Sequence, residues 1–256
     1  MTLRTLLSTA RAEIGYWLRD EWSFEEVGRH WDRTEDYDEV NQGTYSYFRR
    51  FTDGLRLATL PGAGTTLDLC ARTGLGTKFF FEEGKIARAV CADVSMRMGR
   101  ICAERMRQSG LGSWMWVPIA DYRLPFREHT FDTILCFETV EHFARPAELL
   151  MDIGRVTRSG GVLILTTPNL LWEPIHAIAA ILGLHHSEGP HRFLRLAQLK
   201  RLVEAAGFRI RRLETTVLVP GGPPFLVRFG EWLERRTRRT LMPLLGLRRV
   251  IFATRR

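Results

Sequence analysis

The sequence predicts an α/β protein whose core is a doubly wound, mostly parallel sheet of seven strands. Three observations support this fold class. Short apolar segments alternate with amphipathic ones from about residue 65 onward, which is the pattern of strands and crossover helices. Residues 131–137 are almost wholly apolar, as a parallel strand covered on both faces is. Glycine or proline stands at several junctions between segments.

A helical cap is predicted for residues 1–60, before the sheet begins. Apolar residues recur every three or four positions from Leu3 to Trp17, as one face of a helix requires, and a second helix is expected at 45–57. Pro61 and the glycines after it break the chain. The main domain is therefore expected at 61–256, a length that is ample for one hydrophobic core.

Crossover helices are expected between the strands of the main domain. Ser95 is expected to cap one of them, and Pro146 suits the first turn of another, which the glycine pair 160–161 would end. Two insertions interrupt the alternation, at about 170–192 and 219–247. The expected strands are 66–70, 87–92, 114–119, 131–137, 162–166, 208–218 and 249–254.

Composition and charge narrow the class of protein. Hydrophobic residues make up 45% of the chain and charged residues 26%, which excludes wholesale disorder. No apolar run reaches the 20 or so residues of a membrane span, and the start lacks the apolar middle of a secretory signal, so we expect a cytoplasmic protein. Residues 192–256 hold 16 Lys and Arg against 4 Glu, a charge that suits nucleic acid, an anionic membrane or an acidic substrate.

No metal site is predicted. The four cysteines include no C-x-x-C pair, so neither a zinc site nor a disulfide framework is indicated. His185, His186 and His191 lack the i, i+4 spacing that places two ligands on one helical face. The insertion that carries them is interpreted as a substrate lid.

Acidic residues follow the first three expected strands, at the sheet edge where ligands of such folds bind. The run from Asp68 to Gly74 has Cys70 and Arg72 where a dinucleotide fingerprint has glycines, which disfavours NAD. Asp93 can accept hydrogen bonds from both ribose hydroxyls, and the Asp121 carboxylate can accept one from an adenine amine. These features suit an adenosine without phosphates, and S-adenosylmethionine fits that description.

With these motifs the sequence resembles the class I S-adenosylmethionine-dependent methyltransferases, which have a Rossmann-like fold. Within them it is most similar to the broad group that includes ubiquinone and menaquinone methyltransferases. The resemblance covers roughly residues 65–213 and rests on the order and spacing of several motifs. They lie at 67–74, 93–98, 121–126, 131–132, 141–142, 155–161 and 166–169.

The resemblance implies a role for residues at the ends of the strands. The loop from Cys70 to Gly74 would contact the methionine part of the cofactor, Asp93 the ribose, and Asp121 with the Tyr122 backbone the adenine. The end of the fourth strand would line the methyl-donor end. The implied cofactor residues are Asp68, Cys70, Ala71, Arg72, Gly74, Asp93, Val94, Met98, Asp121, Tyr122, Phe137 and Thr139.

Arg72 is the main departure, because the family usually has glycine there. Its guanidinium can reach the methionine carboxylate as a two-pronged donor, or its bulk can narrow the pocket. We expect an intact site, since Asp68, Gly74, Asp93 and Asp121 are all present. That expectation fails if the acids face away from a cleft or the guanidinium fills it.

Two histidines are candidates for a general base. Methyl transfer from a sulfonium mainly requires alignment, and a base is needed only for a hydroxyl or protonated amine acceptor. His142 is one candidate, although the Glu141–His142 pair is also expected to shape its loop. His191, or His186 beside it, is the rival in the predicted lid. The aromatic residues Trp31, Tyr37, Tyr45 and Tyr47 either cover the cofactor or pack the core.

The predicted function is methyl transfer from S-adenosylmethionine to a small or lipid-like acceptor, at oxygen. A basic amphipathic segment at 228–241 permits peripheral contact with an anionic membrane, although a helix packed on the domain is the simpler interpretation. RNA methylation is an alternative, disfavoured because no Asn-Pro-Pro-aromatic or Pro-Cys motif follows the fourth strand. A non-catalytic binding protein that keeps the fold is the alternative from another class.

Overall fold

A seven-stranded sheet forms the centre of the computed structural model, which describes residues 3–34, 37–38, 44–62, 64–182, 187–237 and 240–256. Its strand order is β3-β2-β1-β4-β5-β7-β6, and only β7 runs antiparallel to its neighbours. This confirms the predicted fold class. The strands are β1 (Thr65–Leu69), β2 (Arg88–Asp93), β3 (Ser113–Pro118), β4 (Phe131–Phe137), β5 (Thr157–Pro168), β6 (Phe208–Thr216) and β7 (Arg248–Arg255).

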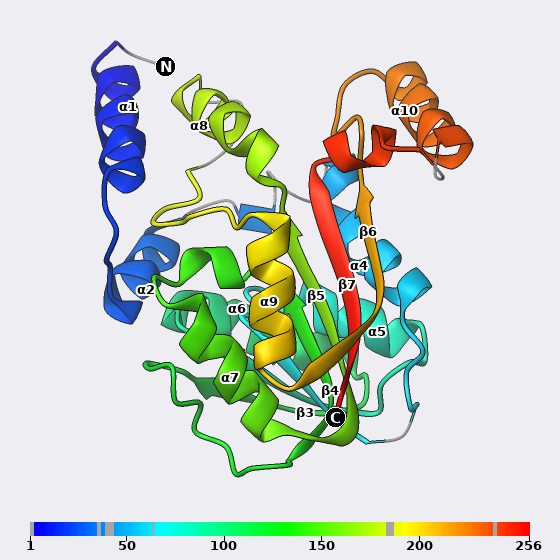
Figure 1. Cartoon of the computed structure of the whole chain (residues 1–256). Helices are drawn as coiled ribbons and strands as arrows, with labels where there is room; N and C mark the ends of the chain where they lie inside the picture. The colour runs from blue at the N-terminus through cyan, green and yellow to red at the C-terminus, as the bar shows by residue number, and fades with distance from the viewer. Residues whose placement is uncertain (1–2, 35–36, 39–43, 63, 183–186, 238–239) are drawn as a thin grey trace.

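Helices cover both faces of the sheet (Figure 1). In the figure α7 and α9 lie over one face, whereas α4, α5 and α6 lie over the other, and α1, α8 and α10 stand at one end of the molecule. The α-helices are α1 (Leu3–Trp17), α2 (Phe24–Arg33), α4 (Tyr45–Leu57), α5 (Leu75–Glu82), α6 (Met96–Ser109), α7 (Pro146–Val156), α8 (Glu173–Ile181), α9 (Leu196–Ala205) and α10 (Pro224–Thr237). The 3-10 helices are η1 (Val140–His142), η2 (Leu170–Trp172) and η3 (Met242–Leu245).

The two faces of β4 supply two separate hydrophobic cores. Ile134 and Cys136 belong to the core under α7 and α9, whereas Leu135 and Phe137 belong to the core under α5 and α6. Successive side chains of a strand point to opposite faces, so a central strand must be apolar on both. This accounts for the apolar run at 134–137, and the bounds of β4 are the ones predicted from the sequence.

The largest error in the predicted elements concerns the glycine pair 160–161. α7 ends earlier, at Val156, where the Thr157 hydroxyl donates to the Ile153 carbonyl at 2.6 Å. The glycines lie inside β5, whose register against β4 shifts between Phe131 and Thr133, and Gly160 has a φ of 77°. They form an irregularity within a strand and do not end the helix. The caps at Ser95 and Pro146 are confirmed.

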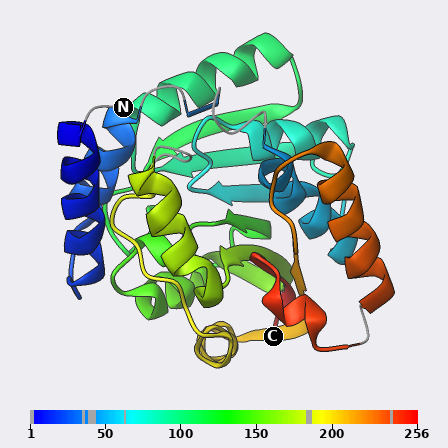
Figure 2. The same cartoon turned by 90° about the horizontal axis from the view of Figure 1, so that it is seen from above.

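The two predicted insertions follow strands that end at the same edge of the sheet. η2 and α8 come after β5, and α10 and η3 lie between β6 and β7. Seen from above, α1, α8, η3 and α10 lie across the end of the molecule that faces the viewer (Figure 2). None of the described helices is both long and apolar enough to cross a membrane. The division into a cap at 1–60 and a domain at 61–256 stays a prediction.

Gly154 fixes how closely α7 approaches the end of α9. A Cβ at this position would stand 2.2 Å from the Ala206 carbonyl oxygen, which is backbone and cannot swing aside. We expect Gly154→Ala to lower the free energy of unfolding in urea by about 1–3 kcal/mol through overpacking. Gly15→Ala in α1, where a Cβ meets no atom within 4 Å, is the control and should be neutral or slightly stabilising. Equal losses in the two variants would contradict this account.

Candidate functional site

The loop between β1 and α5 has a left-handed backbone at three alternate positions. Cys70, Arg72 and Gly74 have φ values of 56°, 49° and 78°. Glycine adopts such angles freely, whereas a residue with a Cβ is strained by roughly 1–2 kcal/mol. The loop therefore has the shape of a glycine-rich turn although two of its three left-handed residues are not glycine.

The Asp93 carboxylate holds this loop in place. It ends β2, and its Oδ2 accepts a hydrogen bond from the Arg72 N–H at 2.7 Å, while Oδ1 accepts one from the Ser95 N–H at 2.8 Å. Asp93 is only 2% exposed. Burial raises the pKa of its carboxyl, although the hydrogen bonds from Ser95 and Arg72 act in the opposite direction.

Asp68 lies beside the same loop, in β1. Its Oδ2 accepts a hydrogen bond from the Thr77 hydroxyl of α5 at 2.6 Å. Burial raises the pKa of the Asp68 carboxyl to about 7, because the charged form is poorly solvated there. The structure thus brings Asp68, Asp93 and the loop together, as predicted from the strand ends.

The Arg72 side chain crosses the carboxyl edge of the sheet. Its guanidinium donates to the Phe137 carbonyl at 3.2 Å and to the Glu138 carbonyl at 2.7 Å, just where β4 ends. The rings of Trp31 and Tyr37 lie 5.1 and 5.8 Å from its central carbon, in the range of cation–π contacts. The guanidinium donors are therefore used by the protein itself.

The cleft that Arg72 crosses is narrow, as far as the described residues define it. Two cavities remain, each of about 10 Å³, which is roughly the space of one water molecule. Asp68 and Phe137 line one cavity, Asp93 and Val94 line the other, and Arg72 lines both. S-adenosylmethionine does not fit this form of the site. Of the two roles foreseen for Arg72, narrowing the pocket is the one observed in this structure, and the expectation of an intact cofactor site stays a prediction.

α2 covers the Asp93 side of the cleft, a feature that the sequence interpretation missed. A Cβ at Gly28 would stand 3.0 Å from the Val94 carbonyl oxygen, so the helix runs against the backbone. Asp32 on α2 accepts hydrogen bonds from the Ser95 hydroxyl at 2.7 Å and the Arg97 N–H at 3.0 Å. The Ser23–Glu26 capping box was the signal in the sequence that marked the start of this helix.

The other predicted cofactor residues divide into structural and exposed positions. Ala71 donates its N–H to the Ala92 carbonyl at 3.1 Å, and the Thr139 hydroxyl lies 3.2 Å from the Leu69 carbonyl. Met98 is fully buried in the core under α6. Asp121 is exposed and accepts the Tyr122 N–H at 2.5 Å. Their predicted cofactor roles stay predictions.

The backbone carbonyls of Glu141 and His142 bind the predicted lid and the N-terminal segment through hydrogen bonds. The His142 carbonyl accepts a hydrogen bond from the Trp22 indole at 2.8 Å, and the Glu141 carbonyl accepts one from the Arg192 N–H at 2.8 Å. Burial lowers the pKa of His142 to about 3, so its ring is neutral and weakly basic at pH 7. This geometry favours the loop-shaping interpretation over general base catalysis.

Glu141 itself is an unusual acid, to which the sequence analysis gave no role apart from shaping its loop with His142. Its Oε2 accepts from the Thr167 hydroxyl at 3.0 Å, while Oε1 has no partner among the residues that the structure describes. Burial, and then the neighbouring Glu138 charge, raises the pKa of Glu141 to about 8. The carboxyl is therefore largely protonated at neutral pH.

His191 is buried with one free ring nitrogen. Its Nδ1 lies 2.8 Å from the Gly189 carbonyl, which can only accept, so Nδ1 carries the proton. Nε2 is then an acceptor, and it has no partner within the described residues. His191 lines a cavity of about 310 Å³ with Tyr16, Glu173 and Phe193. Its ring centroid lies 6.4 Å from that of His142, which lines one of the two small cavities beside Arg72.

His185 and His186 lie outside the described residues, so nothing is assigned to them. Within the described ranges, no three His, Cys, Asp or Glu side chains are grouped closely enough to hold a metal ion. Of the four N-terminal aromatic residues, Trp31, Tyr37 and Tyr47 are buried in the core beside α5 and α6.

Comparison with known sequences identifies the central part of the chain. Residues 67–165 match a family model described as a methyltransferase domain. The chain is 29% identical over 146 residues to the ubiquinone/menaquinone biosynthesis C-methyltransferase UbiE of Escherichia fergusonii. That match covers 54% of this chain and 57% of the relative, so the chain spans little more than half of its length.

Solved structures share the fold at low sequence identity. The [4+2]-cyclase SpnF superimposes with a TM-score of 0.68 at 17% identity, over 91% of this chain and 96% of that one. An S-adenosylmethionine-dependent methyltransferase from Mesorhizobium loti gives 0.62 at 12% identity, over 84% and 99%. At such identities the likeness shows the fold alone, and the two names show that the fold is shared by a cyclase and a methyltransferase.

Arg72→Gly should open the cleft, because it removes the side chain that separates the two cavities and relieves the left-handed strain. We expect the variant to bind S-adenosylhomocysteine at least tenfold more tightly than the wild type in calorimetry, about the effect of 1.4 kcal/mol. Adding Asp93→Ala to this variant should abolish the gain. Wild-type binding as tight as that of Arg72→Gly would show that the guanidinium is no obstacle.

Glu141→Gln should change how stability depends on pH. A carboxyl whose pKa is raised by folding stabilises the fold below its unfolded pKa, and this contribution is lost as the pH rises through about 8. The variant cannot ionise, so its melting temperature should fall less than that of the wild type between about pH 5 and pH 8.5. Glu148→Gln, on the exposed face of α7, is the control and should melt in parallel with the wild type. Parallel curves for Glu141→Gln would contradict the proposed burial effect.

Proposed function

We propose that this chain is a class I S-adenosylmethionine-dependent methyltransferase that methylates an oxygen atom of a small or lipid-like acceptor in the cytoplasm. The match of residues 67–165 is the observation that carries the proposal. S-adenosylmethionine is the cofactor that this domain implies. Because the cleft is closed by Arg72, the proposal requires the guanidinium to leave the Phe137 and Glu138 carbonyls before the cofactor enters.

The character of the acceptor is inferred from the segments around the 310 Å³ cavity. Tyr16, Leu170 and Phe193 form the apolar and aromatic part of its wall, and the polar part is Glu173, His191, Arg192, Arg195 and Gln198. A cavity of this size suits a small molecule or the reacting ring of a larger one. The names of the relatives add support for a lipid-like acceptor, since quinones of this kind are lipid-borne.

His191 supports oxygen as the reacting atom. A hydroxyl must lose its proton as it is methylated, and the group assigned to accept it is Nε2 of His191, a buried acceptor with no partner among the described residues. The Gly189 carbonyl fixes the ring so that Nε2, and not Nδ1, is free. The relatives are C-methyltransferases by name, so carbon is the main alternative to oxygen.

A second candidate function is favoured by the closed cleft. A non-catalytic binding protein that keeps the fold has no need of an open cofactor site, and Arg72 closes this one with hydrogen bonds that satisfy its own guanidinium. RNA methylation, the third alternative, has only the positive charge of residues 192–256 in its favour.

Mass spectrometry of a cell extract treated with the protein and deuteromethyl-labelled S-adenosylmethionine tests these alternatives. We expect a labelled small or lipid-like product that disappears with Asp93→Ala, because the loop at residue 72 loses its anchor. His191→Asn should lower kcat by about a hundredfold or more with little change in KM, as removal of a general base does.

His129→Asn, at a distant left-handed position, is the matched control and should leave turnover unchanged. Label in the RNA fraction would favour RNA methylation. Absence of any product, from the wild type and from Arg72→Gly alike, would favour the non-catalytic protein. A His191→Asn variant that turns over normally would remove the argument for oxygen.

A further inference from the structure

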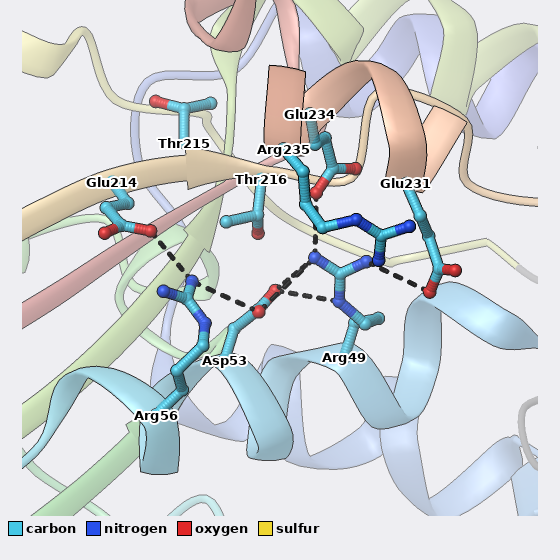
Figure 3. A pocket seen from close by; sticks show the side chains of 9 residues that line it. All are labelled: Arg49, Asp53, Arg56, Glu214, Thr215, Thr216, Glu231, Glu234 and Arg235. Carbon is cyan, nitrogen blue, oxygen red and sulfur yellow. Dashed lines mark hydrogen bonds and ion pairs between the residues drawn. The ribbon is translucent and has the colours of Figure 1, made fainter. Parts of the chain in front are cut away.

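α10 turns its acidic side chains toward the protein. Glu234 pairs with Arg49 of α4 at 2.9 Å through Oε2, and its Oε1 accepts the Leu218 N–H at 2.9 Å. Glu231 accepts a hydrogen bond from the Tyr45 hydroxyl at 2.7 Å. Figure 3 shows both glutamates descending from α10 toward Arg49, at the wall of a cavity of about 350 Å³ between α4, β6 and α10.

The same helix leaves its large apolar side chains in water. Phe225, Phe229 and Trp232 are 72%, 52% and 51% exposed, and their spacing of four and three residues places them in one stripe. Gly230 lies on the packed side, where a Cβ would stand 2.7 Å from Val219. A surface helix normally packs its apolar stripe on the core and turns its charges outward. α10 has the opposite arrangement, with its apolar stripe exposed and its glutamates turned toward the protein.

The outward side of α10 carries cations and lacks acids among its described residues. Arg228 and Arg236 are exposed on it, whereas the two glutamates of the helix are engaged on the inner side. An apolar stripe accompanied by arginines complements a surface that is apolar below and anionic at its edge. An anionic bilayer has this order, with acyl chains under negatively charged headgroups.

Two other segments extend this apolar exposure at the same end of the molecule. Ile175 and Ile178 of α8 and Leu244 and Leu245 of η3 are all exposed. Figures 1 and 2 place α8, η3 and α10 together beyond the ends of β5 and β6. The exposed apolar side chains of these three segments are here called the apical surface. This surface extends over one end of the molecule and is not confined to one groove. Such a surface fits a lipid bilayer better than a single peptide.

We propose that the apical surface docks on an anionic lipid bilayer, with α10 lying in the interfacial plane. Phe225, Phe229 and Trp232 enter the headgroup region, and Arg228 and Arg236 bind lipid phosphates. This contact directs the carboxyl edge of the sheet toward the bilayer, from which a lipid-borne acceptor would arrive. The docking does not depend on the proposed methyl transfer, because it is measured without cofactor or acceptor.

Co-sedimentation of the full chain with vesicles tests the proposal. The wild type should sediment with vesicles of equal parts phosphatidylcholine and phosphatidylglycerol, and much less with phosphatidylcholine alone or at high salt. Phe229→Glu with Trp232→Glu should abolish the binding. Arg228→Gln with Arg236→Gln should weaken it by about fivefold for each arginine. Met151→Glu, an equally exposed apolar residue of α7, is the matched control and should bind like the wild type.

Trp232→Phe keeps the proposal testable if the charged variants fail to fold. This variant should still bind anionic vesicles, but it should lose part of the quenching that lipids brominated near the headgroup cause in the wild-type fluorescence. Wild-type protein that ignores anionic vesicles, or a Met151→Glu variant that loses binding equally, overturns the proposal. So does a dimer in light scattering that Trp232→Glu splits without any vesicle binding, because a second copy would then cover the surface.

Discussion

The Asp93 carboxylate is the contact on which the arrangement of the sheet edge depends. Its two oxygens accept backbone hydrogen bonds from Arg72 and Ser95, so one buried group joins the loop after β1 to the start of α6. The loop can then keep left-handed angles at Cys70 and Arg72 without glycine, because the surrounding contacts fix them. The direction of the Arg72 side chain follows from this backbone.

A buried guanidinium is stable only when it has partners, and three distant parts of the chain provide them for this one. The Phe137 and Glu138 carbonyls accept its hydrogen bonds, and Trp31 and Tyr37 from the N-terminal part lie against it. Glu188 of the predicted lid contributes a favourable charge. The Arg72 guanidinium thus fills the cleft and finds its partners within the protein. These contacts stabilise the closed form of the cleft.

The orientation of α10 has a similar electrostatic origin. Arg49 of α4 pairs with Asp53 on its own helix and with Glu234 on α10, and it is mostly shielded from solvent. Partly buried charges need partners, so the glutamates of α10 are held inward. The aromatic residues on the opposite side are then necessarily directed to solvent. Helix packing is here decided by ion pairs, against the usual preference for burying the apolar stripe.

The sequence by itself determined the sheet, most strand bounds and the position of the acids at strand ends, because these follow from local periodicity and from the rule that parallel strands end at one edge. The sequence also marked Arg72 as the main departure from the family pattern, which usually has glycine at this position. Tertiary structure alone decided where the guanidinium goes, that α2 covers Val94, and that burial raises the pKa of Glu141, because each depends on contacts between residues far apart in the chain. The same holds for α10: its amphipathic pattern was readable, but which side meets water was decided by Arg49, about 180 residues away along the chain.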